Sequence, residues 1–204
     1  MKKALLSFIA TCALSLNMHA DDNQPLTGYF IDSPVSGLYY ETSSNLSGTT
    51  DKGAFQYNSG DIVSFFIGTD SSGYLLTTLS GQEVITPTLS STRPSRSINM
   101  TRLLLSLDDT PEHRDEIILA SKVLSDVEFQ KKLKNLDLSY LDDQDLGIDL
   151  ISVKEAAEHL NKSQEYIKDN FASEEIIFSP RGKVLHNIII AKKDYAGRAC
   201  FYDL

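Results

Sequence analysis

The chain has 204 residues, of which 41% are hydrophobic and 23% charged, and a formal net charge of −9. These values are typical of a globular chain with one or two small domains. The acidic balance excludes a typical nucleic-acid binder or a protein that docks on anionic membranes, because both need an excess of Lys and Arg. With only two cysteines and eleven glycines, the chain is neither a disulfide-rich scaffold nor a low-complexity segment.

Residues 1–20 have the pattern of a secretory signal peptide. Two lysines follow Met1, residues 4–16 are apolar and uncharged, and Ala20 offers a small residue for cleavage. The apolar run is shorter than the roughly 20 residues that cross a membrane as a helix. We therefore expect an exported chain without a transmembrane segment. Lipidation of Cys12 is the alternative processing, which we do not expect because a threonine precedes this cysteine.

Cleavage after Ala20 would change the charge and the cysteine count. The product would carry a net charge of −11, of which −7 falls on residues 21–92, and it would keep one cysteine, Cys200. Cys200 lies in an apolar segment near the end of the chain, so we expect a buried core cysteine. The acidity is therefore concentrated in the first part of the exported chain.

Residues 21–90 have the pattern of an acidic β module. The segment is rich in Gly, Ser, Thr, Tyr and Phe, and turn signals recur every eight to twelve residues, as between short antiparallel strands. Gly, Asp and Ser at these turns supply positive φ angles or cap the chain. The predicted strands are residues 27–31, 38–42, 54–57, 61–67, 74–79 and 83–86, with turns between them that include Ser47-Gly48.

Residues 91–98 are predicted to be a linker, and residues 99–172 a helical region. The spacing of leucines predicts a helix over residues 99–107. Thr110 before Pro111 predicts an N-cap and a helix that continues through Val123. Capping boxes that begin at Ser125 and Ser152 predict two further helices, of which the second ends near residue 171.

Residues 173–204 return to strand character, with apolar segments separated by Gly-containing turns. These strands would either pair with each other as a hairpin or short sheet, or complete the N-terminal sheet. The predicted fold class is therefore α+β: an N-terminal antiparallel β-sandwich-like module, a helical region, and C-terminal strands.

Three stretches of the β module carry a family resemblance. They are the D-S-P-V-S-G run of residues 32–37, the G-T-T-D run of residues 48–51, and the G-D-x-V-x-F-x-I-G pattern of residues 60–68. Together they resemble a module of exported bacterial proteins and lipoproteins, similar in outline to carboxypeptidase regulatory-like, transthyretin-type sandwich domains. The N-x-x-R-L-L run from Asn99 and the S-x-x-E-A-x-x-H-L run from Ser152 resemble segments that follow this module. The resemblance implies a cell-envelope or secreted module and carries no catalytic residues.

The sequence contains no nucleophile elbow, zinc-binding helix, phosphate-binding glycine loop or C-x-x-C pair. His159 lies on a predicted helical face and His186 in a predicted strand, so we interpret both as structural. A Ser/His/Asp site assembled from distant residues stays open as an alternative, because its members need only meet in space. We expect no cofactor and no metal. The alternative is a calcium site outside the EF-hand pattern, formed by Asp142, Asp143 and Asp145.

We therefore predict a secreted or periplasmic, non-catalytic interaction protein of a Gram-negative bacterium that binds a protein or a surface ligand. A periplasmic immunity or inhibitor protein against a secreted toxin is one alternative, and a hydrolase is another. Tyrosines offer large contact areas, and acidic residues steer basic partners. The candidate binding surface consists of Asp32, Tyr39, Tyr40, Glu41, Asp51, Asp61, Asp70 and Tyr74.

Overall fold

The structure is a computed structural model that describes residues 24–171. The predictions for residues 1–20 and 173–204, including those for Cys12, His186 and Cys200, lie outside the described residues. The described part contains both helices and strands in several sheets, as predicted for an α+β protein. No helix in it is long and apolar enough to cross a membrane.

The elements are β1 (Leu26–Phe30), β2 (Val35–Ser36), β3 (Tyr39–Thr42), β4 (Ser47–Thr49), β5 (Ala54–Tyr57), β6 (Ile62–Ile67), β7 (Tyr74–Ser80), β8 (Val84–Ile85), α1 (Pro94–Ser106), β9 (Ile117–Ile118), α2 (Ser121–Leu124), α3 (Val127–Lys134), the 3-10 helix η1 (Leu138–Asp143) and α4 (Val153–Asn170).

All strands of the β module except β2 form two sheets. One has the order β5-β1-β8, and the other is antiparallel throughout with the order β4-β3-β6-β7. The six predicted strands correspond to β1, β3, β5, β6, β7 and β8, within one residue at each end. The predicted turn at Ser47-Gly48 is wrong, because both residues belong to β4 and pair with β3. The glycine at position 48 leaves room for the ring of Tyr40, because a Cβ at this position would lie only 3.1 Å from that ring.

A cluster of aromatic rings joins the two sheets. Phe30 and Phe55 come from one sheet, and Phe65 from the other; the ring centre of Phe65 lies 5.0 Å from each of the first two. The ring of Tyr40 lies 5.8 Å from that of Phe55. All four rings are buried. Because side chains alternate along a strand, the neighbours of Tyr40 and Phe65 in β3 and β6 point to the other face of their sheet.

The helical region is organised around α1. Leu103 and Leu104 are fully buried, as the predicted spacing requires. The helix begins at Pro94, so the second half of the predicted linker 91–98 is helical. Proline suits the first helical position because its φ is already helical and its missing N–H would have no partner in the helix.

Arg102 on α1 holds three segments together. Its side chain is only 6% exposed, and its guanidinium donates two hydrogen bonds to the carboxylate of Asp142 in η1, at 2.9 and 2.6 Å. Its Nε donates to the carbonyl of Ile151 just before α4, at 2.8 Å. Asn99, one turn earlier, donates from its amide to the carbonyl of Leu138 at 2.8 Å. Asn99 and Arg102, the two polar residues of the N-x-x-R pattern, therefore connect α1 to η1, and Arg102 also connects it to the start of α4.

The predicted helix from Thr110 through Val123 is wrong. Ile117 and Ile118 form β9, which pairs in parallel with β2. The N–H of Ile117 donates to the carbonyl of Pro34 at 2.9 Å. The carboxylate of Asp108 accepts from the N–H groups of Thr110 and Ile118, which closes the segment between them as a loop. Pairing with a distant segment therefore outweighs the local capping signal, and only the short α2 is helical.

The two predicted capping boxes differ in outcome. In α4, the Ser152 hydroxyl accepts from the N–H of Glu155 and the Glu155 carboxylate accepts from the N–H of Ser152, as predicted. In α3, the cap is Asp126 rather than Ser125, because the Asp126 carboxylate accepts from the N–H groups at the second and third helical positions. The Ser125 hydroxyl donates to the carbonyl of Ser121 instead.

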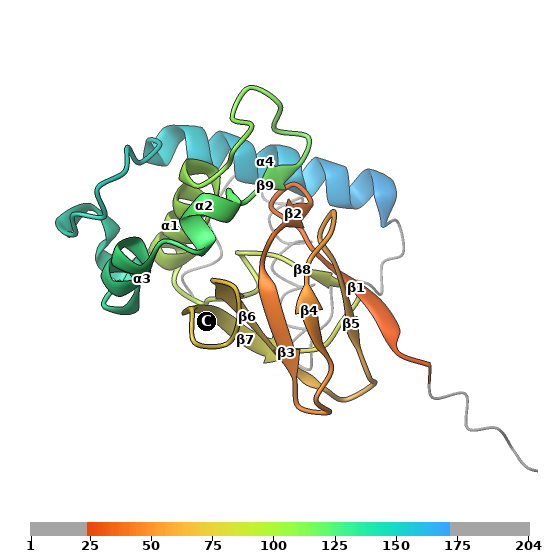
Figure 1. Cartoon of the computed structure of the whole chain (residues 1–204). Helices are drawn as coiled ribbons and strands as arrows, with labels where there is room; N and C mark the ends of the chain where they lie inside the picture. Colours follow the sequence, from red (N-terminus) through yellow and green to blue (C-terminus); the bar gives the residue numbers. More distant parts are fainter. Residues whose placement is uncertain (1–23, 172–204) are drawn as a thin grey trace, which may run out of the picture.

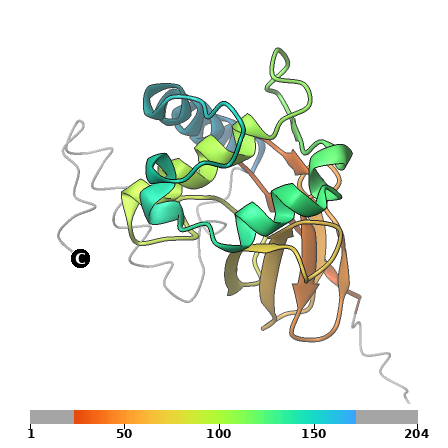
Figure 2. The same ribbon diagram turned by 60° about the vertical axis from the view of Figure 1, so that its left-hand side comes forward.

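Helix α4 connects the helical region to the β module. Figure 1 shows the strands of the β module below and α4 running across the top of the molecule, past β2 and β9. Figure 2 shows the helices gathered above the strands after a 60° turn. Helix α4 packs along α1. At its end the ring of Phe171 lies 5.3 Å from that of Tyr29 on β1, so α4 contacts both parts of the chain.

Candidate functional site

The D-S-P-V-S-G segment, residues 32–37, forms the junction between the β module and α4. It begins two residues after the end of β1 and contains β2. Ser33 has a φ of 52°, in the left-handed region that is strained for a residue with a side chain. A contact with α4 stabilises this conformation: the Ser33 N–H donates a hydrogen bond to the hydroxyl of Ser163, at 3.1 Å. The Ser33 hydroxyl donates to the carbonyl of Arg114 at 2.7 Å.

Asp32 is completely buried at this junction. Neither carboxylate oxygen has a hydrogen-bond partner among the described residues, which is rare for a buried polar group. Burial raises the pKa of Asp32 from 3.8 to about 6, and the nearby His159 opposes this rise. The hydroxyls of Thr101 and Ser163 also oppose it, although neither forms a hydrogen bond with the carboxylate.

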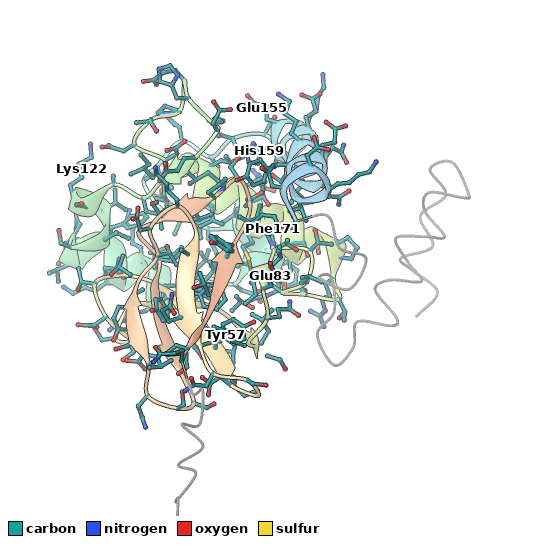
Figure 3. The ribbon with its side chains drawn as sticks, turned by 90° about the vertical axis from the view of Figure 1, so that its right-hand side faces the viewer. Tyr57, Glu83, Lys122, Glu155, His159 and Phe171 are labelled. Carbon is teal, nitrogen blue, oxygen red and sulfur yellow. The ribbon has the colours of Figure 1, made fainter. Side chains whose placement is uncertain are left out.

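His159 faces Asp32 from α4. Its Nε2 lies 2.9 Å from the backbone carbonyl of Asp32 and 3.7 Å from the carboxylate oxygen Oδ1. The first contact assigns the proton to Nε2, which donates it to the carbonyl. Figure 3 shows His159 on the side of α4 that faces the β module, one turn after Glu155. The side chain of His159 is 8% exposed, so the pair is shielded from solvent.

The junction contains serine, histidine and aspartate, but their arrangement is not that of a catalytic triad. In a triad, serine contacts one ring nitrogen and the carboxylate orients the other. Here Ser33, at 3.5 Å, and Asp32 both lie at Nε2 of His159. Nε2 donates to the Asp32 carbonyl, and the Ser33 hydroxyl donates to Arg114. The contacts of His159 are therefore those of a histidine that holds the backbone of Asp32, and they differ from those of a general base in a triad.

A cavity of about 600 Å³ lies beside this junction. Its polar walls come from the loop before β9 and from one face of α4, and its apolar part comes from α1 and the segment before α4. Charges of both signs face it, with two acids on α4 near one lysine. The lining residues are Ser33, Leu105, Arg114, Asp115, Ile151, Glu155, Glu158, His159, Lys162 and Tyr166.

Four of the eight predicted surface residues are buried, so the candidate binding surface requires correction. Asp32 has no exposed surface, and Asp61, Tyr40 and Tyr74 are each less than a tenth exposed. Tyr40 and Tyr74 point inward because side chains alternate along β3 and β7. Tyr74 donates from its hydroxyl to the carbonyl of Leu136.

Asp61 organises a turn instead of facing a partner. Its carboxylate accepts hydrogen bonds from the hydroxyls of Ser43 and Ser44, at 2.9 and 2.7 Å, and from the N–H of Asn58 at 2.7 Å. Desolvation alone would raise the pKa of Asp61, but the hydrogen bonds from Asn58 and the two serines lower it overall. The ionised carboxylate therefore stabilises the loops at this end of the sheet.

The other four predicted residues, Tyr39, Glu41, Asp51 and Asp70, are exposed or half-buried. Tyr39 and Glu41 lie on the outer face of the four-stranded sheet, and the Tyr39 hydroxyl donates to the Glu41 carboxylate. Asp51 lies two residues after the end of β4, and Asp70 lies in the turn between β6 and β7.

Two residues that we did not predict complete this surface. Strand register places Tyr39 opposite Phe66, and Phe66 opposite Leu75. The rings of Tyr39 and Phe66 lie 6.2 Å apart, and Leu75 is 48% exposed. Alternation with the buried Phe65 and Leu76 could have identified both residues from the sequence. We call Tyr39, Phe66 and Leu75 the outer row.

The acidic residues proposed as a calcium site do not converge. Asp142 binds Arg102, and the Asp145 carboxylate accepts from the N–H of Gly147 at 2.8 Å. Within residues 24–171, no three His, Cys, Asp or Glu side chains lie close enough together to hold a metal ion. Comparison of the chain with protein-family models, curated proteins and solved structures gave no match.

Proposed function

We propose that the chain is an exported, non-catalytic interaction protein of a Gram-negative bacterium. Its β-sandwich-like module would bind a basic protein surface through the outer row and the acids around it. The signal-peptide pattern of residues 1–20 supports export. The single observation that carries the binding role is the outer row, an apolar and aromatic strip on the solvent side of a sheet.

The outer row has no structural role comparable to that of the inner rings. The core of the β module is already filled from the other face of the same strands, so Phe66 and Leu75 are not needed to close it. Antiparallel sheets with one solvated face normally place polar residues there. Aromatic and aliphatic side chains that interrupt this pattern mark a site of interaction when they are contiguous.

The charges around the outer row favour a basic partner. Asp51 and Asp70 lie in loops at the same end of the sheet as Tyr39 and Phe66, and Glu41 lies in the next row of side chains. The surface therefore combines an apolar centre with three acids, and two lysines lie beside them: Lys52 follows Asp51, and Lys134 lies near Asp70. Such a pattern gives affinity through burial of the centre, and fast, selective association through the charges.

The proposal is tested by capturing partners with the chain from Asp21 onward, from envelope and medium fractions. Leu75→Ser removes apolar surface from the outer row, and Val153→Ser on α4 is the matched control, because both side chains are 48% exposed. We expect a basic protein that binds directly after purification, that is lost with Leu75→Ser and that is kept with Val153→Ser. Equal capture by both variants would overturn the proposal. An enzyme that loses activity when bound would identify the chain as an inhibitor.

A further inference from the structure

The contacts between α4 and the β module converge on one buried pair, Asp32 and His159. Three hydrogen bonds surround the pair: His159 to the Asp32 carbonyl, Ser33 to Ser163, and Ser33 to the carbonyl of Arg114. The carboxylate of Asp32 has no hydrogen bond among the described residues, and the same holds for the Thr101 hydroxyl and for Nη1 of Arg114. The charge state of Asp32 therefore decides how favourable the junction is.

We propose that the Asp32–His159 pair makes the docking of helix α4 on the β module sensitive to pH. The helix is firmly docked while the pair holds a proton, and it is loosened when the pair has lost it. This device is independent of the proposed binding role, because the outer row lies on another part of the module.

The physical basis is the cost of burying an uncompensated charge. With one proton, the pair is either two neutral groups or an ion pair, and its net charge is zero. Without it, the carboxylate of Asp32 is buried as a charge with no hydrogen bond, which is unfavourable in a site with no exposed surface. Separation of α4 from the junction would expose Asp32 to water and relieve this cost. The raised pKa of Asp32 agrees with this direction.

The other charged groups at the junction do not remove this dependence. Arg114 and Asp115 face it from the loop before β9, and Glu155, Glu158 and Lys162 face it from α4. The three acids and two bases carry a net charge of −1, which does not compensate a second negative charge on Asp32. From α1, Thr101 contributes only a hydroxyl, which itself has no hydrogen-bond partner among the described residues.

The test is amide hydrogen exchange of the full exported chain, measured by NMR or mass spectrometry at about pH 5 and about pH 8. Rates are divided by the intrinsic exchange rate at each pH. The protection of α4 and of the Ser33 amide is expected to fall about tenfold between these conditions, as linkage requires for a carboxyl whose pKa rises by about two units on docking. In Asp32→Asn, which cannot ionise, the protection should not change with pH. Asp51→Asn is the matched control for an exposed aspartate and should behave as the wild type.

Each outcome decides the proposal. A fall in α4 protection in the wild type and in Asp51→Asn, without a fall in Asp32→Asn, supports it. A wild-type protection that is constant with pH overturns it, as does a fall of equal size in Asp32→Asn. A fall in β3 and β6 that persists in Asp32→Asn also overturns it, because another group would then be responsible for the pH dependence. If Asp32→Asn does not fold, Asp32→Ser, which cannot ionise either, takes its place, and its protection should likewise not change with pH.

Discussion

Replacement of Asp32 by asparagine should change the pH dependence of global stability by a calculable amount. The native pKa of Asp32 is about 6, whereas its ordinary value is 3.8. One pKa unit corresponds to about 1.4 kcal/mol, so the full effect is about 3 kcal/mol. Asp32 is completely buried, so solvent does not screen this effect.

The sign follows from proton binding. Between the two pKa values, the native state binds more protons than the unfolded state, so the free energy of unfolding falls as pH rises. The stability that the protonated carboxyl provides is fully present below about pH 3.8 and is lost above about pH 6. Asp32→Asn carries no such group. The difference in unfolding free energy, Asp32→Asn minus wild type, should therefore increase by about 2.5 kcal/mol between about pH 4 and about pH 8.

The assay is urea unfolding followed by far-UV circular dichroism, because the chain has no tryptophan. The change in the difference with pH is the quantity to compare, since any pH-independent effect of the amide cancels in it. A difference that stays constant over this range would refute the reasoning. A difference that decreases with rising pH would show that Asp32 is stabilised as an anion, with a lowered pKa.

Three further substitutions test other parts of the structure. Arg102→Leu should lower the unfolding free energy by about 3 kcal/mol or more, because it leaves the partly buried carbonyl of Ile151 and the amide oxygen of Asn99 without their donor. Urea unfolding measures this loss, and a loss within the error of the fit would contradict the role given to Arg102. Ser152→Ala should cost about 1 kcal/mol through loss of the α4 cap, and thermal unfolding without a change in Tm would show that the cap is dispensable. Asp61→Asn should have a lower free energy of unfolding than the wild type at neutral pH. This difference should shrink as pH falls below 3.8, because the pKa of Asp61 is lowered in the native state and the carboxylate loses its stabilising charge there. A difference that is the same at acidic and neutral pH would contradict the role given to Asp61.

The strands of the β module could be predicted because their signals are local. The alternation of polar and apolar side chains, together with the turn residues on either side, predicted the ends of β5 and β6 within one residue. The capping box at Ser152 located the start of α4 for the same reason. Where the local signal was strong and no distant segment competed with it, the prediction was confirmed.

The junction could not be predicted because it depends on contacts between distant segments. The pairing of β2 with β9 joins Val35 to Ile117, and nothing near Thr110 indicates that its segment is needed there. Asp32 looked like a surface residue because aspartate is rarely buried. Only the fold places His159, 127 positions away, against it. By contrast, Phe66 and Leu75 could have been found from alternation alone.

The central claim is that the outer row is the binding surface, and the most direct measurement is the dissociation constant of a captured partner for Leu75→Ser and for Val153→Ser. We predict a Kd at least about tenfold higher for Leu75→Ser, as for a residue at the centre of an interface, and a Kd within about twofold of the wild type for Val153→Ser. Equal dissociation constants for the two variants would contradict the account.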